Sequence, residues 1–183
     1  LNNIALKILN NGKGILAADE STATMTKRLE SVNVPSTPEN RLLFREILFS
    51  SSGMTECIGG VILYDETIKQ ESSKKNNIPK LISEMGSMPG IKVDTGAKVL
   101  AGSPGEKITE GLDGLRERLK DYYKLGAKFT KWRGVYSISK DYPSKLSIHS
   151  NAHALARYSA LVQECNMVPI VEPEVLMDGE HSA

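Results

Sequence analysis

The sequence predicts an α/β fold in which strands and helices alternate along the chain. Five short apolar segments contain many of the β-branched and aromatic residues that favour strands, at residues 14–19, 58–64, 90–94, 129–133 and 168–171. The stretches between them can hold helices, and several carry apolar residues at helical spacing. Alternating strands and helices imply a parallel sheet, either doubly wound or closed into a (β/α)8 barrel.

Helices are predicted at residues 1–10, 22–32, 38–49, 80–85, 112–125 and 151–164. Ser21 or Thr22 is the expected N-cap of the second helix. Thr37 is the expected N-cap of the third, with Pro38 at its first helical position. Gly126 should end the fifth helix, because glycine adopts the left-handed backbone that often closes helices.

The apolar periodicity also predicts which helical side chains are buried. The expected core residues of three helices are Met25, Leu29, Leu42 or Leu43, Ile47, Leu48, Leu112, Leu115, Leu119 and Tyr122. Residues 69–77 are polar and should form a solvated connection. Residues 96–105 are rich in Gly, Ser and Pro, which predicts an extended loop over the strand ends.

Charged residues at the strand ends distinguish between the two parallel folds. Seven of them follow apolar strand segments at four strands: Asp19, Lys92, Asp94, Lys131, Arg133, Glu172 and Glu174. In a barrel such side chains converge on one point at the carboxyl-terminal rim, whereas an open sheet spreads them along a line. We therefore expect a (β/α)8 TIM barrel, of which about the first five βα units are present.

The same charges predict a site for an anionic substrate. Lys131 and Arg133 project from one face of their strand, because strand side chains alternate. Buried charges are unfavourable unless they pair or serve a charged ligand, and a purely structural ion network is the alternative. Cations of this kind suit phosphate, Glu172 suits general acid–base work, and crowded lysines lower one another's pKa. The pattern predicts acid–base or imine chemistry on a phosphorylated metabolite.

Composition excludes several other classes. The 183 residues suggest one domain, and a net charge of +1 argues against a nucleic-acid or membrane-surface protein. No apolar run approaches the roughly 18 residues of a membrane span. Cys57 and Cys165 form no CxxC motif, which favours a reduced, cytoplasmic setting. Because the chain starts at Leu1 and stops without a helix-ending signal, we expect residues 1–183 to be a partial barrel domain truncated at both ends.

Three motifs that might indicate a cofactor or metal do not fit their context. The G-x-G-x-x-A pattern at residues 12–17 precedes a strand instead of following one, so it does not predict dinucleotide binding. Residues 102–107 lack the Walker spacing. His149 and His153 lie four apart with no evident third ligand, which favours a surface pair over a metal site. No cofactor and no metal are expected.

The chain resembles the class I, Schiff-base fructose-bisphosphate aldolases, and matches roughly the amino-terminal half of a family member. Six motifs carry the resemblance and occur in family order: Gly14-Ile-Leu-Ala-Ala-Asp-Glu-Ser21, Cys57-Ile-Gly-Gly-Val-Ile-Leu63, Gly90-Ile-Lys-Val-Asp94, Gly111-Leu-Asp-Gly-Leu115, Lys131-Trp-Arg133 and Val168-Pro-Ile-Val-Glu-Pro-Glu174. Each motif is modest alone, and together they are highly specific.

The resemblance implies a lyase of glycolysis and gluconeogenesis that reversibly cleaves fructose 1,6-bisphosphate to dihydroxyacetone phosphate and glyceraldehyde 3-phosphate. It implies a homo-oligomer, specifically a tetramer, and a phosphorylated sugar as substrate. The catalytic residues that it implies are Asp19, Lys131, Glu172 and Glu174. The substrate-binding residues that it implies are Ser21, Thr24, Arg28, Lys92 and Arg133.

The sequence departs from the family pattern at two points, and the second leaves alternative functions open. Thr24 stands where vertebrate members usually have serine. The Schiff-base lysine belongs to a sixth-strand motif, Glu-Gly-Thr-Leu-Leu-Lys-Pro, that this sequence does not contain, so residues 1–183 alone are expected to be inactive. A non-catalytic anion-binding or scaffold protein on the same barrel is the main alternative, and a transaldolase-like enzyme is a third.

Overall fold

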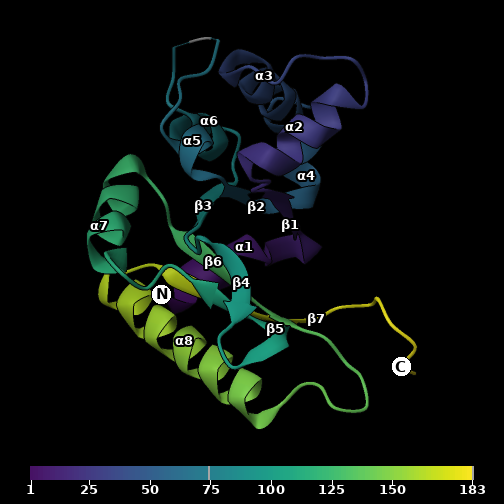
Figure 1. Ribbon diagram of the computed structural model, residues 1–183. Helices are drawn as coiled ribbons and strands as arrows, with labels where there is room; N and C mark the ends of the chain where they lie inside the picture. Colours follow the sequence, from purple (N-terminus) through teal and green to yellow (C-terminus); the bar gives the residue numbers. More distant parts are fainter. Residues whose placement is uncertain (74, 183) are drawn as a thin grey trace.

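A computed structural model describes residues 1–73 and 75–182, so Lys74 and Ala183 lie outside the described residues (Figure 1). Five parallel strands form one sheet: β1 (Gly14–Ala18), β2 (Ile58–Leu63), β3 (Met88–Lys92), β6 (Phe129–Tyr136) and β7 (Val168–Val175). Their order in the sheet is β1-β2-β3-β6-β7, which is also their order in the chain. A doubly wound sheet reverses its order at a switch point, and this sheet does not. The prediction of parallel βα units that wind in one direction, as in a barrel, is confirmed.

Eight helices connect or cover these strands in the described part of the chain: α1 (Asn2–Ile8), α2 (Thr22–Glu30), α3 (Pro38–Phe49), α4 (Met54–Cys57), α5 (Asp65–Ile68), α6 (Ile78–Glu84), α7 (Leu115–Leu125) and α8 (Lys145–Glu164). Ser21 caps α2 by accepting a hydrogen bond from the Thr24 N–H, and Thr37 caps α3 in the same way. Gly126 ends α7 in the left-handed conformation, as predicted. None of these helices is long and apolar enough to cross a membrane.

Two segments differ from the sequence-based expectation. Residues 96–105 belong to an antiparallel hairpin of β4 (Gly96–Leu100) and β5 (Ser103–Glu110), not to a loop. The Gly and Pro residues of this segment are typical of loops, but Gly102, at φ 82°, makes the turn of the hairpin. Helix α8 starts at Lys145, well before residue 151, because the Ser144 hydroxyl accepts a hydrogen bond from the Ser147 N–H. The apolar residues of its first turns, Leu146 and Ile148, are exposed, so they give no sign of a buried helical face before residue 151.

The core lies between the sheet and the helices that cover its outer face. Thr130 and Trp132 on β6 are fully buried there, and Trp132 packs against Tyr158 of α8 with ring centroids 5.4 Å apart. The Thr130 and Tyr158 hydroxyls are 2.6 Å apart and share a hydrogen bond. Lys131 and Arg133 project from the opposite face of the same strand, as the alternation predicts. The face that carries the charges is therefore the inner face of the curved sheet.

The burial of helix α3 agrees only in part with the prediction. Leu42 and Leu48 are partly buried against the core, but Leu43 is 55 % exposed and Ile47 is 59 % exposed. The buried positions are Arg41, Arg45 and Phe49. The prediction for Ile47 is wrong because two arginines with fixed partners occupy the inward face. Met25 and Leu29 of α2 are buried, as are Leu115, Leu119 and Tyr122 of α7, and Leu112 is partly buried.

Helix α1 closes the amino-terminal end of the sheet. Its last residue, Ile8, clusters with Ile62 and Phe129 on the inner face. The helix passes so close to β2 that a methyl group added at Gly59 would lie 1.8 Å from the Ile8 carbonyl oxygen. Only glycine allows this approach.

Replacing Gly59 with alanine is therefore expected to push α1 away from the sheet. Overpacking of this kind costs about 1–3 kcal/mol of stability. Urea unfolding of the full-length protein measures the effect. The matched control is Gly134→Ala on β6, where the nearest atom would lie at 3.5 Å, an ordinary contact. Equal unfolding free energies for the two variants would contradict the prediction.

Candidate active site

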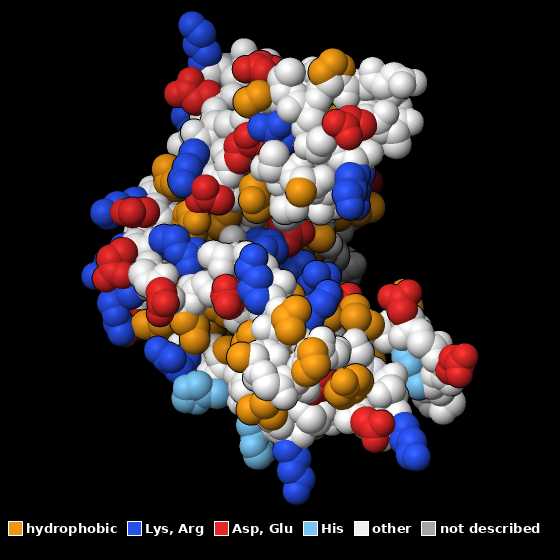
Figure 2. All heavy atoms as spheres, in the orientation of Figure 1, with side chains coloured by type: hydrophobic (Ala, Val, Ile, Leu, Met, Phe, Trp, Pro, Cys, Tyr) orange, Lys and Arg blue, Asp and Glu red, His pale blue; other side chains and the backbone are white. Residues whose placement is uncertain are grey.

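The carboxyl ends of four strands bring the predicted charges together. Asp19 follows β1, Lys92 ends β3, and Lys131 lies on β6. The register pairs Lys92 with Lys131. Two residues further along β6 it pairs Arg133 with Glu172 of β7, so these side chains stand at two successive levels of the sheet. Figure 2 shows a hollow in this side of the molecule, with basic and acidic side chains on its inner wall.

Lys131 connects strands that do not pair with one another. Its Nζ lies 3.1 Å from Asp19 Oδ2 and 3.4 Å from Glu172 Oε2. Strands β2 and β3 separate β1 from β6, so on a flat sheet the two strands would lie roughly 14 Å apart, three strand spacings. The contact between Lys131 and Asp19 requires that the sheet curl until its carboxyl ends converge. This contact supports the barrel architecture independently of the strand order.

The remaining charges form two further pairs. Lys92 Nζ lies 2.6 Å from Asp94 Oδ1, and an Arg133 guanidinium nitrogen lies 2.9 Å from Glu174 Oε2. Asp94 is nearly buried, with 3 % of its side chain exposed. All seven strand-end charges therefore have a partner of opposite sign. This pairing removes the cost of placing them close together, and it leaves the site close to neutral.

The pKa of Lys131 differs from the sequence-based expectation. Burial alone lowers the pKa of the Lys131 ammonium, but the carboxylates of Asp19 and Glu172 outweigh that effect, and the net pKa lies above its ordinary value. The expectation that crowded lysines lower one another's pKa is wrong here because the nearest charges are acids. A protonated amine is a poor nucleophile, so Lys131 is suited to stabilise charge and donate hydrogen bonds.

A cavity of about 360 Å³ opens at this edge of the sheet. Seven of the nine predicted site residues line it: Asp19, Ser21, Thr24, Arg28, Lys92, Lys131 and Arg133. Glu172 and Glu174 do not line it, and reach it through their ion pairs with Lys131 and Arg133. The cavity thus combines cations, three carboxylates and hydroxyl groups, which suits a phosphorylated ligand with hydroxyl groups.

The amino-terminal end of α2 forms one wall of the cavity. The Ser21 hydroxyl caps the helix and lies 3.1 Å from the Thr24 hydroxyl. Both residues line the cavity, so the first turn of the helix lies beside it. A helix amino terminus favours negative charge, which agrees with the cations on the opposite strands.

Sequence reasoning missed two residues that support this wall. Glu20 lines the cavity and forms an ion pair with Arg28. Arg45 of α3 is fully buried; it donates hydrogen bonds to the Glu20 carbonyl oxygen at 2.6 Å and to Thr67 Oγ1 at 2.7 Å. Burial lowers the pKa of the Arg45 guanidinium, and the carboxylates of Glu20 and Glu66 oppose the shift. The position of Glu20 directly after Asp19 could have predicted that it belongs to the site. No residue near Arg45 in the sequence indicates that it supports the site.

Asp94 also lines the cavity. The sequence identified it as a strand-end charge but did not assign it to the site. Its Oδ1 accepts hydrogen bonds from Lys92 Nζ and from the Gly96 N–H at 3.1 Å. Asp94 therefore fixes Lys92 at the start of the β4–β5 hairpin.

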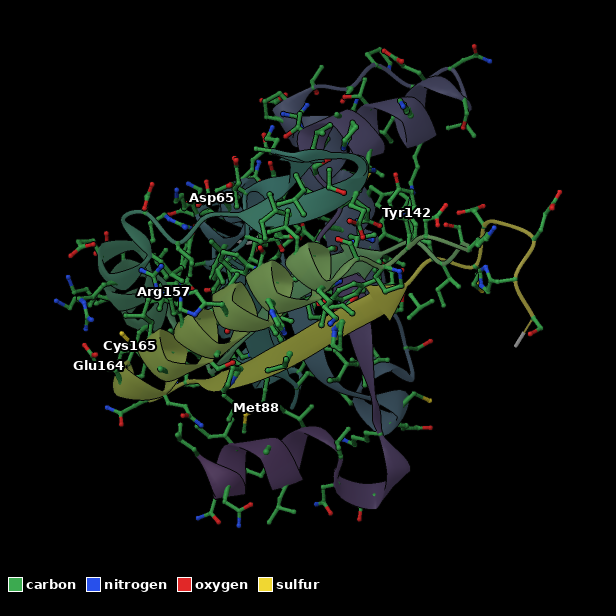
Figure 3. All side chains as sticks on the ribbon, turned by 60° about the horizontal axis from the view of Figure 1, so that its bottom comes forward. Asp65, Met88, Tyr142, Arg157, Glu164 and Cys165 are labelled. Atoms are coloured by element: carbon green, nitrogen blue, oxygen red, sulfur yellow. The ribbon has the colours of Figure 1, made fainter. Side chains whose placement is uncertain are left out.

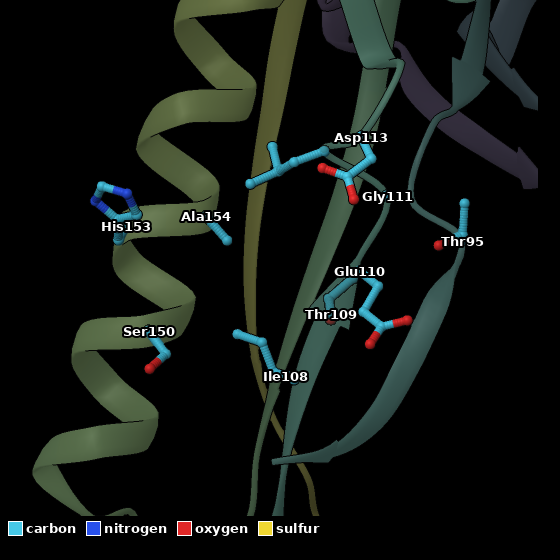
Figure 4. A pocket seen from close by; sticks show the side chains of 10 residues that line it. Thr95, Ile108, Thr109, Glu110, Gly111, Asp113, Ser150, His153 and Ala154 are labelled. Atoms are coloured by element: carbon cyan, nitrogen blue, oxygen red, sulfur yellow. The ribbon is translucent and has the colours of Figure 1, made fainter. Parts of the chain in front are cut away.

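A larger cavity of about 660 Å³ lies between the hairpin and α8 (Figure 4). Its polar groups include the carboxylates of Glu110 and Asp113 and the imidazole of His153. None of the predicted site residues lines it. His149 and His153 belong to no cluster of three potential metal ligands within residues 1–73 and 75–182.

Comparison with known proteins identifies relatives over almost the whole chain. The family model described as "Glycolytic: Fructose-bisphosphate aldolase class-I" matches residues 1–183. A probable fructose-bisphosphate aldolase class 1 of Xylella fastidiosa is 54% identical over 97% of this chain and 53% of its own length. Fructose-bisphosphate aldolase B of Gallus gallus is 53% identical over 99% of this chain and 50% of its own length.

A solved structure agrees with these relatives. It is a Plasmodium falciparum fructose-bisphosphate aldolase in complex with TRAP and a small-molecule inhibitor. The two folds superpose with a TM-score of 0.95 at 46% sequence identity, over 98% of this chain and 52% of the solved chain. The chain spans about half the length of the curated relatives it matches. Strand order, convergent charges and these matches agree: the chain belongs to the class I fructose-bisphosphate aldolase family.

Proposed function

We propose that these residues are part of an enzyme that reversibly cleaves fructose 1,6-bisphosphate to dihydroxyacetone phosphate and glyceraldehyde 3-phosphate in glycolysis and gluconeogenesis. The observation that carries the proposal is the contact of Lys131 with both Asp19 and Glu172 beside a cavity lined by further cations. Cleavage needs a base for a hydroxyl proton, a proton carrier for imine formation and cationic groups that bind phosphate. Asp19 and the cations of the cavity supply the base and the phosphate contacts, and Glu172, paired with Lys131 beside the cavity, supplies the proton carrier.

Asp19 is the proposed base for the C4 hydroxyl. As its carboxylate takes that proton, the C3–C4 bond breaks and its electron pair moves toward the imine carbon. Lys131, held 3.1 Å from Asp19, stabilises the negative charge that shifts during this step. Glu172, on the other side of Lys131, is the proposed acid and base for dehydration of the carbinolamine that precedes the imine.

Binding of the phosphorylated sugar is assigned to the other cavity residues. Arg28, Lys92 and Arg133 supply positive charge for phosphate, and Ser21 and Thr24 supply hydroxyl groups. Glu174 orients Arg133 through their ion pair. The ion pairs hold the cations in place before the substrate arrives, which reduces the entropy lost on binding.

The Schiff-base lysine is proposed to lie outside residues 1–183, in a sixth-strand motif of the type Glu-Gly-Thr-Leu-Leu-Lys-Pro. Two observations support this assignment. The chain spans about half the length of its relatives, and the raised pKa of Lys131 makes that residue a poor nucleophile. Residues 1–183 alone are therefore expected to have no lyase activity.

We further propose a cytoplasmic homotetramer. One relative, the cytosolic fructose-bisphosphate aldolase 6 of Arabidopsis thaliana, is 53% identical over 93% of this chain and supports the cytoplasmic location. Light scattering coupled to size exclusion gives the mass of the full-length protein directly.

Borohydride trapping tests the proposed reaction. Full-length protein treated with dihydroxyacetone phosphate and borohydride should be labelled at one lysine outside residues 1–183, and should then lose activity. Activity should survive EDTA, because the imine replaces a metal as the electron acceptor. Labelling at Lys131 would contradict the assignment, and no labelling at all would favour the non-catalytic binding protein.

A further inference from the structure

A second charged cavity, of about 380 Å³, lies at the amino ends of the strands, opposite the candidate active site. Residues that directly precede three strands line it: Lys13 before β1, Ser87 before β3 and Lys128 before β6. Lys7 of α1 adds a third lysine. In Figure 3, Met88, another lining residue, lies between the sheet and α1.

The charge of this cavity is not balanced. Lys7, Lys13 and Lys128 line it, and no carboxylate does. Within the described residues none of these lysines forms an ion pair, whereas every strand-end cation of the candidate active site has one. The chain as a whole has a net charge of only +1, so the local excess does not reflect a generally basic protein.

Neutral hydrogen-bonding groups accompany the lysines. Asn10 and Asn11 also line the cavity, on a tight turn in which Asn11 has the left-handed φ of 57°. Their side-chain amides donate no hydrogen bond inside the described part of the chain, so their N–H groups remain available to a ligand. The Ser87 hydroxyl is already used, since it donates to the Ile58 carbonyl oxygen at 2.7 Å.

The floor of the cavity is rigid. The Lys128 N–H donates to the Pro89 carbonyl oxygen at 2.8 Å, which joins β3 to the start of β6. The close contact of Ile8 with Gly59 fixes the helix that carries Lys7. Lys128 Nζ lies 5.4 Å from the centre of the Tyr123 ring, a weak contact at an accessible site that a phosphate can replace. A preformed floor lowers the cost of ordering the site on binding.

We propose that this cavity binds a diphosphate group, separately from the sugar-phosphate site at the other edge of the sheet. Three ammonium groups on three separate segments suit a ligand with several phosphate charges, and the volume lies within the usual range of small-molecule sites. Barrel enzymes keep their reacting groups at the carboxyl-terminal face. A diphosphate at the amino-terminal face therefore acts as a bound effector and not as a substrate.

Lysine acylation followed by mass spectrometry tests the site residue by residue in the full-length protein. Pyrophosphate at about four times its Kd should slow acylation of Lys7, Lys13 and Lys128 about fivefold, by simple occupancy. Lys120 and Lys124 on the exposed surface of α7 should react at an unchanged rate. Sodium chloride at equal ionic strength is the reference. Protection by ADP as well as pyrophosphate would show that a nucleoside can carry the diphosphate, and protection by pyrophosphate alone would show a free ion.

Variants make the test decisive. Lys13→Met with Lys128→Met should remove the protection of Lys7 and weaken pyrophosphate binding by at least about tenfold, because two charge-assisted contacts are lost. Lys120→Met with Lys124→Met is the matched control and should bind normally. If the first double variant unfolds, the single variant Lys7→Met replaces it, because Lys7 is exposed. The protection of Lys13 against acylation is then measured and should be weaker than in the natural protein. Absence of protection at millimolar pyrophosphate, equal protection of Lys120, or protection that survives the double variant would each overturn the proposal.

Discussion

Replacing Lys131 with methionine is expected to lower kcat for cleavage of fructose 1,6-bisphosphate by about 100- to 10,000-fold in the full-length enzyme. Methionine fills a similar space but cannot hold charge. Asp19 and Glu172 would lose the cation that both contact. The effect should fall mainly on kcat, because the lost interaction is strongest when charge moves during bond cleavage.

Steady-state and single-turnover kinetics measure this effect. Lys131→Arg keeps the positive charge but changes its shape, so it should recover part of the rate. Lys120→Met, on the exposed face of α7, is the control and should leave kcat unchanged. A Lys131→Met enzyme that turns over within twofold of the natural protein would rule out the proposed charge role.

Replacing Arg45 with methionine is expected to destabilise the fold by about 3–5 kcal/mol, the usual effect of removing one partner of a buried charged contact. The Thr67 hydroxyl, which is fully buried, and the Glu20 carbonyl oxygen would both lose their donor. Glu20 would also keep its carboxylate near the cavity with only Arg28 to balance it. The wall formed by the start of α2 should become less ordered.

Urea unfolding of the full-length protein gives the free energy, and Arg41→Met is the matched control. Arg41 lies one turn earlier on the same buried face of α3 and pairs with Glu66. The Glu66 side chain is 25% exposed, so water can compensate it and the cost should be smaller. A smaller loss of stability for Arg45→Met than for Arg41→Met would disprove the assigned role.

Local patterns in the sequence predicted much of the sheet and the site. The period-two alternation of β6 placed Lys131 and Arg133 on one face, because backbone geometry alone determines that alternation. Charges at the ends of successive parallel strands predicted their convergence, because a one-way winding sheet brings those ends together. Caps such as Thr37 were predictable, because capping depends on residues only three positions away.

The features that were not predicted depend on tertiary contacts. Nothing near Arg45 in the sequence indicates that Thr67 and Glu20 will be its partners, so the apolar Ile47 seemed the better core residue. The pKa of Lys131 depends on which charged groups lie nearest to it. Composition gives the number of acidic and basic residues but not their positions, so it could not predict the direction of the shift. The β4–β5 hairpin was hidden because Gly102 reads equally well as a loop residue and as the turn of a hairpin.

The ion pair between Lys131 and Asp19 has a mechanical consequence. Backbone hydrogen bonds link only neighbouring strands. The ion pair instead joins the carboxyl ends of β1 and β6, which are separated by two other strands, and so restrains the distance across the curved sheet. A ligand that draws Lys131 away from Asp19 would remove this restraint. We therefore expect occupancy of the cavity to alter the curvature of the sheet through the Lys131 side chain.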